Sequence, residues 1–287
     1  MDLNEITTFP AIELAHRRTE KPNVNDFRMH THTRMELYYF IEGHASYRVE
    51  GTTYPLEQGD ILIMESGEAH SLLIYPEQPY ERITIHFSPQ ILNEANRYLL
   101  QAFTDRPLGK WNRQSSRMLS SCPIRPCLER MFAYGKQQDL EGVRAYFIPL
   151  LKEIHSNWKI QSASGEELLQ TGQVTRMIRY INLHLTELKG IENLEQNFYL
   201  SKSQLNRIFQ RETGTTIWKY VQIKRLFLAR EMLQSGTMPS EVFSSCGYRD
   251  YSTFYRGYRK QFGKTPQEDC LETDRKCSQT MDRVSMI

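Results

Sequence analysis

The chain has 287 residues, a net charge of +2 and 39% hydrophobic residues, which suits two ordinary globular domains. It has no run of about 18 apolar residues that would span a membrane, and its acidic N-terminus lacks the apolar segment of a secretory signal. The sequence therefore predicts a cytoplasmic protein. The charge is uneven, because residues 1–167 carry 18 Lys and Arg against 22 Asp and Glu, whereas residues 168–287 carry 18 against 12. This asymmetry predicts that only the second part binds a polyanion.

The N-terminal part, residues 1–90, has the pattern of a small β-barrel or jelly roll. Short segments of alternating apolar residues, separated by turns that contain glycine, extend from Val24 to Pro89. The clearest predicted strands are 36–41, 45–49, 60–64 and 82–87.

After Pro89 the apolar period changes to that of amphipathic helices, which predicts a helical region over residues 91–158. The predicted helices are 91–103, 127–134 and 143–158. Residues 159–167 are polar and aperiodic and predict a linker. Residues 168–268 predict helices joined by short turns, and residues 269–287 predict a polar, frayed tail.

An internal repeat is the most informative feature of the basic part. The segment 207–216 recurs as 256–265, and each copy follows a short helix, a tight turn and a helix start. In the first copy, Ser201 and Gln204 have the spacing of a capping box. In the second copy, helix signals occur in the same order: a proline for the first turn, a glycine at the end and an aspartate as the next cap. These are Pro239, Gly247 and Asp250. The pattern predicts two helix-turn-helix units.

The second helix of each unit has a polar face made of residue types that contact base edges in the major groove. The outward positions are Ser203, Asn206, Arg207 and Gln210 in the first unit, and Ser252, Tyr255, Arg256 and Arg259 in the second. A helical bundle with solvated polar faces would explain one such helix. Two copies in register within the basic part favour DNA binding. The predicted helix 217–234 has no Gly or Pro and would hold the two units at the spacing of successive major grooves, about 34 Å.

Residues 170–268 resemble the DNA-binding domain of AraC/XylS-type transcription regulators. The resemblance rests on Ser201–Gly214, Gly247-Tyr248 and the closing segment Phe262–Pro266. It implies seven helices, of which the third and sixth read DNA. The positions that would contact bases are Ser203, Asn206, Arg207, Tyr251, Ser252, Tyr255 and Arg256. One departure is Phe243, where the family usually has Ala; it is expected to alter packing without touching a DNA-reading residue.

Residues 30–43 resemble the first motif of cupins, and Gly59, Gly67 and His70 match most of the second. Along an extended chain, His30, His32 and Glu36 point the same way. With His70 they form a set that suits Fe, Mn, Ni or Zn. Sensor domains of the AraC type resemble cupins and often carry such histidines without a metal. Departures from the motifs at Val24, Glu65 and Ile74 favour this second interpretation, so no metal and no other cofactor is predicted.

The barrel is therefore predicted to bind a small polar effector, with a sugar as the first candidate and a small acid as another. The residues expected to hold it are His30, His32, Arg34, Glu36, Tyr38 and His70, and further candidates for the lining are Tyr47, Tyr54, Arg82 and His86. Aromatic faces and charged donors suit either ligand.

The sequence predicts an α+β protein of two domains: a cupin-like β-barrel or jelly roll with following helices, and an all-α domain with two helix-turn-helix units. We expect a transcription regulator, more an activator than a repressor, and not an enzyme. Its expected partners are double-stranded promoter DNA, RNA polymerase, a small-molecule effector and a second copy of the chain, paired through residues 91–158. Two alternatives remain open: a metal-dependent cupin enzyme fused to a DNA-binding domain, and an effector-independent regulator controlled by a partner protein.

Overall fold

The computed structural model describes residues 3–27, 29–75, 78–119, 123–164 and 172–270. The chain divides into two compact units, residues 1–175 and residues 176–287, and each is described by itself. None of the helices within the described ranges is both long and apolar enough to cross a membrane.

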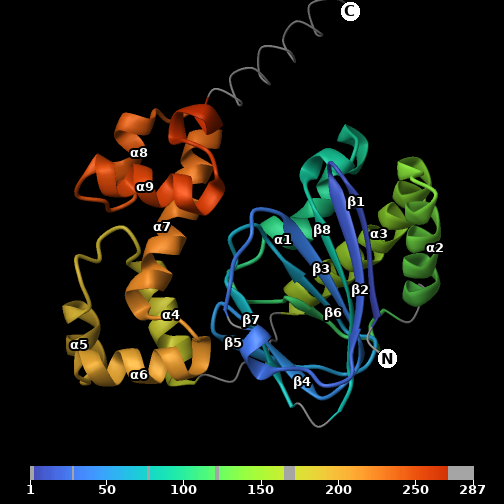
Figure 1. Ribbon diagram of the computed structural model, residues 1–287, viewed down its shortest axis with the longest axis horizontal. Helices are drawn as coiled ribbons and strands as arrows, with labels where there is room; N and C mark the ends of the chain where they lie inside the picture. Colours follow the sequence, from blue (N-terminus) through green and yellow to red (C-terminus); the bar gives the residue numbers. More distant parts are fainter. Residues whose placement is uncertain (1–2, 28, 76–77, 120–122, 165–171, 271–287) are drawn as a thin grey trace, which may run out of the picture. The chain divides into compact units, whose positions relative to one another are not determined.

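The N-terminal unit contains two antiparallel sheets (Figure 1). The six-stranded sheet has the order β1-β2-β8-β3-β6-β9, and the three-stranded sheet has the order β5-β4-β7. The strands are β1 (Leu3–Phe9), β2 (Ile12–Thr19), β3 (Met35–Glu42), β4 (Ala45–Val49), β5 (Thr52–Pro55), β6 (Ile61–Met64), β7 (His70–Ile74), β8 (Tyr80–Phe87) and β9 (Arg113–Gln114).

The large sheet has two buried faces because successive side chains on a strand point in opposite directions. On β3, Leu37 and Tyr39 belong to a core shared with helices, whereas Tyr38 and Phe40 belong to a second core shared with the small sheet. Strand β8 pairs antiparallel with β3 and places Glu36 opposite His86. The face toward the small sheet therefore carries both apolar and ionisable side chains.

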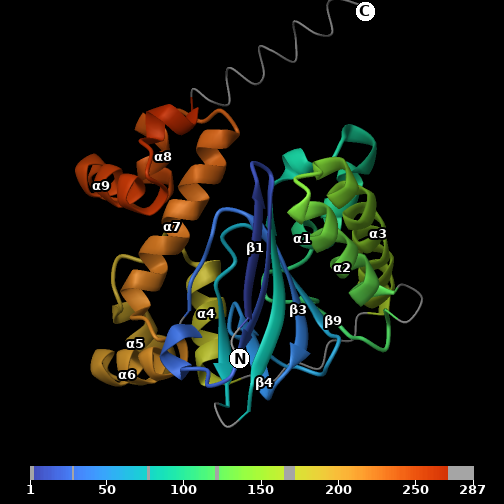
Figure 2. The ribbon, with the colours of Figure 1, turned by 45° about the vertical axis from the view of Figure 1, so that its right-hand side comes forward.

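Helices α2 (Ile124–Lys136) and α3 (Leu140–Ser164) cover the other face of the large sheet (Figures 1 and 2). Buried residues of both helices pack in one core with alternate residues of β3, β6 and β8. Short turns precede them: η1 (Val24–Phe27), η2 (Pro89–Ile91), η3 (Glu94–Leu100) and α1 (Gln101–Thr104).

The four predicted strands correspond to β3, β4, β6 and β8, but β1 and β2 were not predicted. The single predicted helix over 91–103 is instead two 3-10 turns and a short α-helix. The linker prediction is wrong for residues 159–164, which continue α3. Tertiary contacts extend the helix there, because the Gln161 amide donates to the Arg113 carbonyl (3.2 Å) and accepts from Gln114 (2.9 Å).

The C-terminal unit consists of helices, with α7 placed between the pair α5–α6 and the pair α8–α9 (Figure 1). The helices are α4 (Gln173–Leu183), which starts in the first unit, α5 (Glu192–Phe198), α6 (Lys202–Thr213), α7 (Ile217–Gln234), α8 (Pro239–Ser245) and α9 (Tyr251–Phe262). Residues 266–270 begin a further helix. The third and sixth helices of this unit are therefore α6 and α9, as the resemblance implied.

The helix starts follow the local signals in the sequence. Ser201 and Gln204 form a reciprocal capping box at α6, Pro239 occupies the first turn of α8, and the Asp250 carboxylate accepts from the Thr253 N–H (2.7 Å) at α9. These interactions satisfy N–H groups that a helix start would leave unpaired.

One arginine of α7 holds the connection between α4 and α5 and the turn between α8 and α9. The buried Arg225 guanidinium donates to the carbonyls of Leu185 (2.9 Å), Gly247 (2.7 Å) and Leu188 (2.5 Å). Gly247 has a φ of +82°, and a Cβ there would lie 2.4 Å from the Thr186 carbonyl oxygen. Only glycine fits this turn.

The predicted polar tail is wrong for its first residues. Asp269 is buried, and its carboxylate accepts from the Tyr258 hydroxyl (2.6 Å) and lies 3.2 Å from Arg230 Nε. Residues 271–287 lie outside the described residues.

Candidate DNA-binding and effector sites

Helix α6 presents a polar side to solvent because its apolar residues pack inward. Leu205 and Phe209 are fully buried, whereas Ser203 and Arg207 are exposed. The first predicted DNA-reading face is therefore accessible at these two positions.

Asn206 lies on the same side of α6 but is half-buried, and its amide is already bonded. Its Nδ2 donates to the Lys202 carbonyl (3.1 Å), and its Oδ1 accepts from the backbone N–H of Ile217 (3.3 Å). Ile217 is the first residue of α7. The Asn206 side chain therefore joins α6, the second helix of the first helix-turn-helix motif, to α7, which connects the two motifs.

Helix α9 repeats the arrangement of α6. Phe254 and Tyr258 are buried, whereas Ser252 and Arg256 are exposed and Tyr255 is half-buried. These positions form the second candidate face.

Tyr251 is 40% exposed at the start of α9, and its ring packs edge-on against Phe243 of α8, with 5.7 Å between ring centroids. The expectation that Phe243 touches no DNA-reading residue is therefore wrong. A ring at position 243 reaches Tyr251, whereas the methyl group of Ala would be too short to do so.

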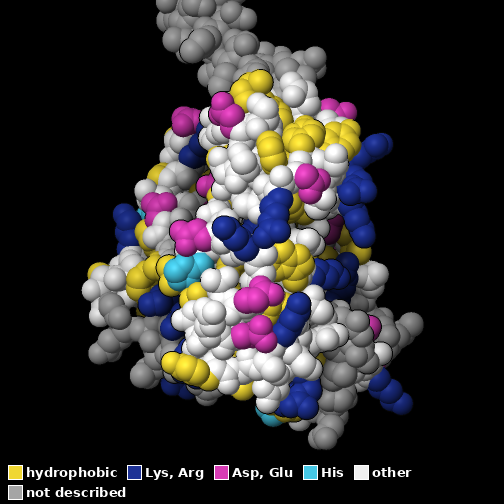
Figure 3. All heavy atoms as spheres, turned by 90° about the vertical axis from the view of Figure 1, so that its left-hand side faces the viewer, with side chains coloured by type: hydrophobic (Ala, Val, Ile, Leu, Met, Phe, Trp, Pro, Cys, Tyr) yellow, Lys and Arg dark blue, Asp and Glu magenta, His cyan; other side chains and the backbone are white. Residues whose placement is uncertain are grey.

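The C-terminal part of the chain has an excess of positive charge, with 18 Lys and Arg against 12 Asp and Glu over residues 168–287. Figure 3 shows Lys and Arg side chains along the right-hand edge of the drawn face and others near its centre and left, where they alternate with Asp and Glu. Clustered positive charge attracts the phosphate backbone of DNA without regard to sequence.

The N-terminal unit contains a cavity of about 310 Å³ between its two sheets. Strand β8 supplies alternate residues to it, and these are the residues of β8 that do not face the helical core. The lining residues are Arg17, Thr19, Asn23, Asp26, Phe27, His30, Glu36, Tyr38, Tyr47, Leu72, Tyr80, Arg82, Thr84 and His86.

Beside this cavity, three histidines surround one buried carboxylate. Glu36 Oε2 lies 2.7 Å from His32 Nε2, 3.2 Å from His70 Nε2 and 3.6 Å from His86 Nε2. Glu36 and His70 are buried, whereas His32 and His86 are half-buried. Burial alone would raise the pKa of Glu36, but the three surrounding histidines hold that pKa well below its usual value.

Four of the six predicted effector residues, His30, Glu36, Tyr38 and His70, lie in or against this region. His32 reaches it through Glu36. Arg34 is not part of the lining, because its guanidinium donates to the Pro10 carbonyl (3.2 Å).

Tyr54 was a further candidate for the lining, but its hydroxyl donates to the Gly109 carbonyl (2.8 Å) instead. Arg17 was not predicted, because strand β2 was not recognised. Arg82 was proposed, and its guanidinium lies 4.7 Å from the Tyr80 ring centroid and 5.4 Å from that of Phe27.

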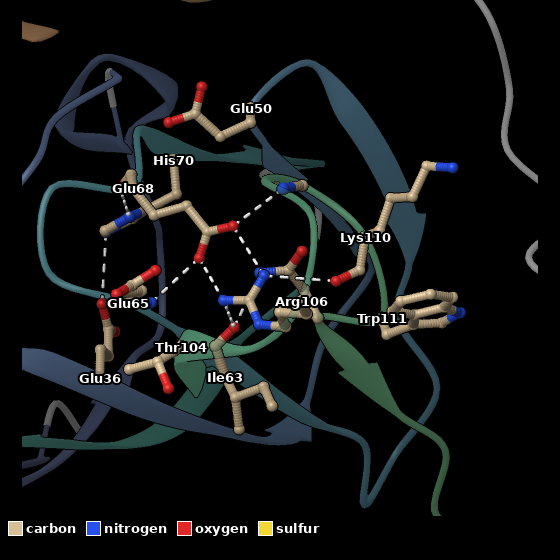
Figure 4. Close-up of polar contacts among 12 residues, drawn as sticks. Glu36, Glu50, Ile63, Glu65, Glu68, His70, Thr104, Arg106, Lys110 and Trp111 are labelled. Atoms are coloured by element: carbon tan, nitrogen blue, oxygen red, sulfur yellow. Dashed lines mark hydrogen bonds and ion pairs between the residues drawn. The ribbon is translucent and has the colours of Figure 1, made fainter. Parts of the chain in front are cut away.

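A buried ion pair supports the turn that carries His70 (Figure 4). The Glu68 carboxylate pairs with the Arg106 guanidinium and also accepts from the N–H groups of Glu65 (3.0 Å) and Gly109 (2.9 Å). Two residues further on, His70 Nδ1 donates to the Glu68 carbonyl (2.8 Å). The Glu68–Arg106 pair thus fixes the position of the His70 ring.

Two family models match the two units. Residues 13–133 match an AraC-like ligand binding domain, and residues 194–269 match a helix-turn-helix domain. The first match contains the cavity and its histidines, and the second contains α6 and α9.

The chain is similar to known transcription regulators. The chain is 22% identical over 275 residues to the HTH-type transcriptional activator RhaS of Escherichia fergusonii, with 93% of this chain and 95% of that protein covered. It is 29% identical over 96 residues to the xylose operon regulatory protein of Escherichia coli, with 33% of this chain and 24% of that protein covered. A solved structure of a probable AraC family transcriptional regulator from Rhodopseudomonas palustris is 28% identical, covering 33% of this chain and 91% of that one, with a TM-score of 0.32.

A ligand-binding sheet domain joined to a double helix-turn-helix domain defines a transcription regulator that binds specific DNA and responds to an effector. The chain belongs to the AraC family of such regulators.

Proposed function

We propose that a small polar metabolite, with a sugar as the first candidate, binds the cavity of the N-terminal domain and thereby activates transcription at a promoter. The observation that supports this is the cavity itself, in which carboxylate, imidazole, phenol and guanidinium groups converge. Together these groups can donate to and accept from every hydroxyl of a sugar. One relative, the xylose operon regulatory protein, is named for a sugar operon.

The acting form is proposed to be a cytoplasmic homodimer that recruits RNA polymerase and has no enzymatic activity. Its domains are proposed to follow the sequence-based boundaries, except that α3 continues to Ser164; residues 165–167 of the predicted linker lie outside the described residues. Helices α2 and α3 are the candidate dimer contact.

For DNA recognition, we propose that Ser203, Arg207, Ser252 and Arg256 contact base edges, with Tyr251 and Tyr255 beside them. These side chains are exposed or half-exposed on matching faces of α6 and α9. Asn206 is assigned a positioning role, because its amide holds the start of α7.

A fragment of residues 165–270 is expected to fold and bind the promoter site alone, since the cores and both faces are local to it. Its affinity should fall steeply with salt, with the logarithm of the binding constant decreasing by about 0.9 per phosphate contact for each tenfold rise in salt. Fluorescence anisotropy over a salt series measures this. A salt-independent affinity would contradict the assignment of the C-terminal unit as the DNA-binding part. The full chain should bind more tightly than the fragment if the N-terminal unit dimerises.

An effector is expected to raise the melting temperature of the full chain. A metabolite at 100 times its dissociation constant stabilises the folded state by about 2.7 kcal/mol. The measurement is a thermal shift across a panel of sugars and small carboxylic acids. Arg82→Gln, which alters the cavity, should reduce the shift, whereas Arg97→Gln, an exposed control outside the lining, should not. An unchanged melting temperature across the panel would favour control by a partner protein, and conversion of a panel compound would favour the enzyme alternative.

A further inference from the structure

The cluster around Glu36 differs from the set expected from the cupin motifs. Among the described residues, His32, Glu36 and His86 have ligand atoms that all lie within 4.8 Å of one another. His86 comes from β8 and is absent from both motifs, whereas His30 is exposed and is not in this group. The strand pairing explains the difference, because Glu36 on β3 is directly opposite His86 on β8.

Each of the three histidines near Glu36 directs its Nδ1 toward another oxygen atom. His32 Nδ1 lies 2.7 Å from the Arg34 carbonyl, and His70 Nδ1 lies 2.8 Å from the Glu68 carbonyl. A carbonyl oxygen can only accept, so both Nδ1 atoms carry the hydrogen. His86 Nδ1 lies 3.8 Å from Glu13 Oε1.

A neutral ring that donates from Nδ1 has a lone pair on Nε2. In His32 and His70 this lone pair faces the carboxylate of Glu36, which also offers only lone pairs. The contact is repulsive unless a cation lies between the groups. If hydrogen atoms on Nε2 filled these contacts instead of a metal ion, the His32 and His70 rings would both have to be positively charged beside the single carboxylate of Glu36.

The distances suit a metal ion in place of protons. Nitrogen and oxygen ligands lie about 2.0–2.2 Å from Zn²⁺, which separates neighbouring ligand atoms by roughly 3.0–3.5 Å in tetrahedral or octahedral geometry. The distance from Glu36 Oε2 to His70 Nε2, 3.2 Å, lies in this range, whereas the distances to His86 Nε2 (3.6 Å) and His32 Nε2 (2.7 Å) lie slightly above and below it, so a bound ion would require small shifts of these rings.

The surroundings hold the ligands in place, as is usual around metal sites. Histidines that bind metals generally donate their other N–H to a carbonyl or a carboxylate. Here the acceptors are the Arg34 carbonyl for His32 and the Glu68 carbonyl for His70. Glu13 is opposite His86 across β2 and β8, but at 3.8 Å it is near His86 Nδ1 without a hydrogen bond. Figure 4 shows His70 directed at Glu36, above the Glu68–Arg106 pair.

We propose that the N-terminal domain binds one divalent transition metal ion through His32, Glu36 and His86, with His70 as a further donor. Imidazole with carboxylate selects Zn, Fe, Ni or Cu over Mg and Ca. Glu36 and His86 also line the cavity, so an open coordination position would face the effector. This proposal departs from the metal-free prediction made from the motif departures.

The test uses the full chain without a histidine tag, stripped with a chelator and titrated with Co²⁺ while its visible absorbance is recorded; Zn²⁺ then competes. One Co²⁺ per chain is expected. Removing a group that only orients a ligand costs up to about 100-fold in affinity, so His86→Ala and Glu36→Gln should weaken binding by more than this. His44→Ala is the matched control, because His44 is exposed, stacks on Tyr75 and belongs neither to the cluster nor to the cavity lining, so this variant should bind Co²⁺ as the parent protein does.

His86→Gln serves as a second variant if His86→Ala does not fold, with circular dichroism and promoter binding as the folding controls. Absence of stoichiometric Co²⁺ and Zn²⁺ binding would overturn the proposal. Loss of binding in His44→Ala but not in the His86 variants would also overturn it. This experiment measures metal binding alone. If no metal binds, the proposed function is still tested separately by promoter binding and by the thermal shift with metabolites.

Discussion

Replacement of Arg106 by alanine is expected to destabilise the N-terminal domain by about 3–5 kcal/mol, because it leaves a buried charge without its partner. The Arg106 and Glu68 side chains are 1% and 0% exposed. Burial alone would raise the pKa of Glu68, but the Arg106 guanidinium and the hydrogen bonds around the carboxylate lower that pKa to about 2. The Arg106 guanidinium also donates to the carbonyls of Ile63 and Lys110, so its loss removes support from two further segments.

Urea unfolding of the full chain at pH 7, followed by near-ultraviolet circular dichroism, measures this change. Arg117→Ala is the matched control: Arg117 is 82% exposed and lies 3.5 Å from Glu57. An exposed pair of this kind contributes about 0–1 kcal/mol. Equal unfolding midpoints for the two variants would show that the Glu68–Arg106 pair does not hold the turn before His70.

The same pair should make the parent protein sensitive to acid. The folded pKa of Glu68 is lowered to about 2, below the unfolded value of about 4.3. Its contribution to stability is therefore complete above the unfolded pKa and is lost as the pH falls toward 2.

The DNA-binding part could be predicted closely because its signals are local. The Ser201–Gln204 capping box and the Asp250 cap each involve residues three positions apart. The repeat then fixed the equivalence of α6 and α9. The sequence did not reveal the role of Asn206, because its partner Ile217 belongs to the next helix and neither residue has an unusual local pattern.

The sensor site was predicted less completely because its contacts are distant in the chain. The pairing of β2 and β3 with β8 brings Arg17 to the cavity and His86 to Glu36, and no motif encodes that register. Arg106 reaches Glu68 across 38 residues, from the segment between the predicted helices 91–103 and 127–134. Residue types identified the chemistry of the site, whereas long-range strand pairing decided which residues take part.

Replacement of Arg207 or Arg256 by alanine is expected to weaken binding to the specific promoter site by about 1–3 kcal/mol each, because each change removes a possible bidentate contact to guanine. Both side chains are exposed at equivalent positions of α6 and α9. Binding to unrelated DNA should fall much less, because it depends on total charge.

Competition anisotropy with specific and unrelated duplexes at one fixed salt concentration separates these two effects. Arg211→Ala is the control on α6, since Arg211 is 72% exposed and lies 3.4 Å from Glu212, outside the proposed DNA-reading face. It should change specific and unrelated binding by the same small factor. Asn206→Ala should instead lower the melting temperature of the C-terminal unit, because it leaves the Ile217 N–H without its acceptor. If Arg207→Ala and Arg256→Ala both retain the parent ratio of specific to unrelated affinity, the assigned faces do not read the sequence, and another side of these helices must lie in the groove.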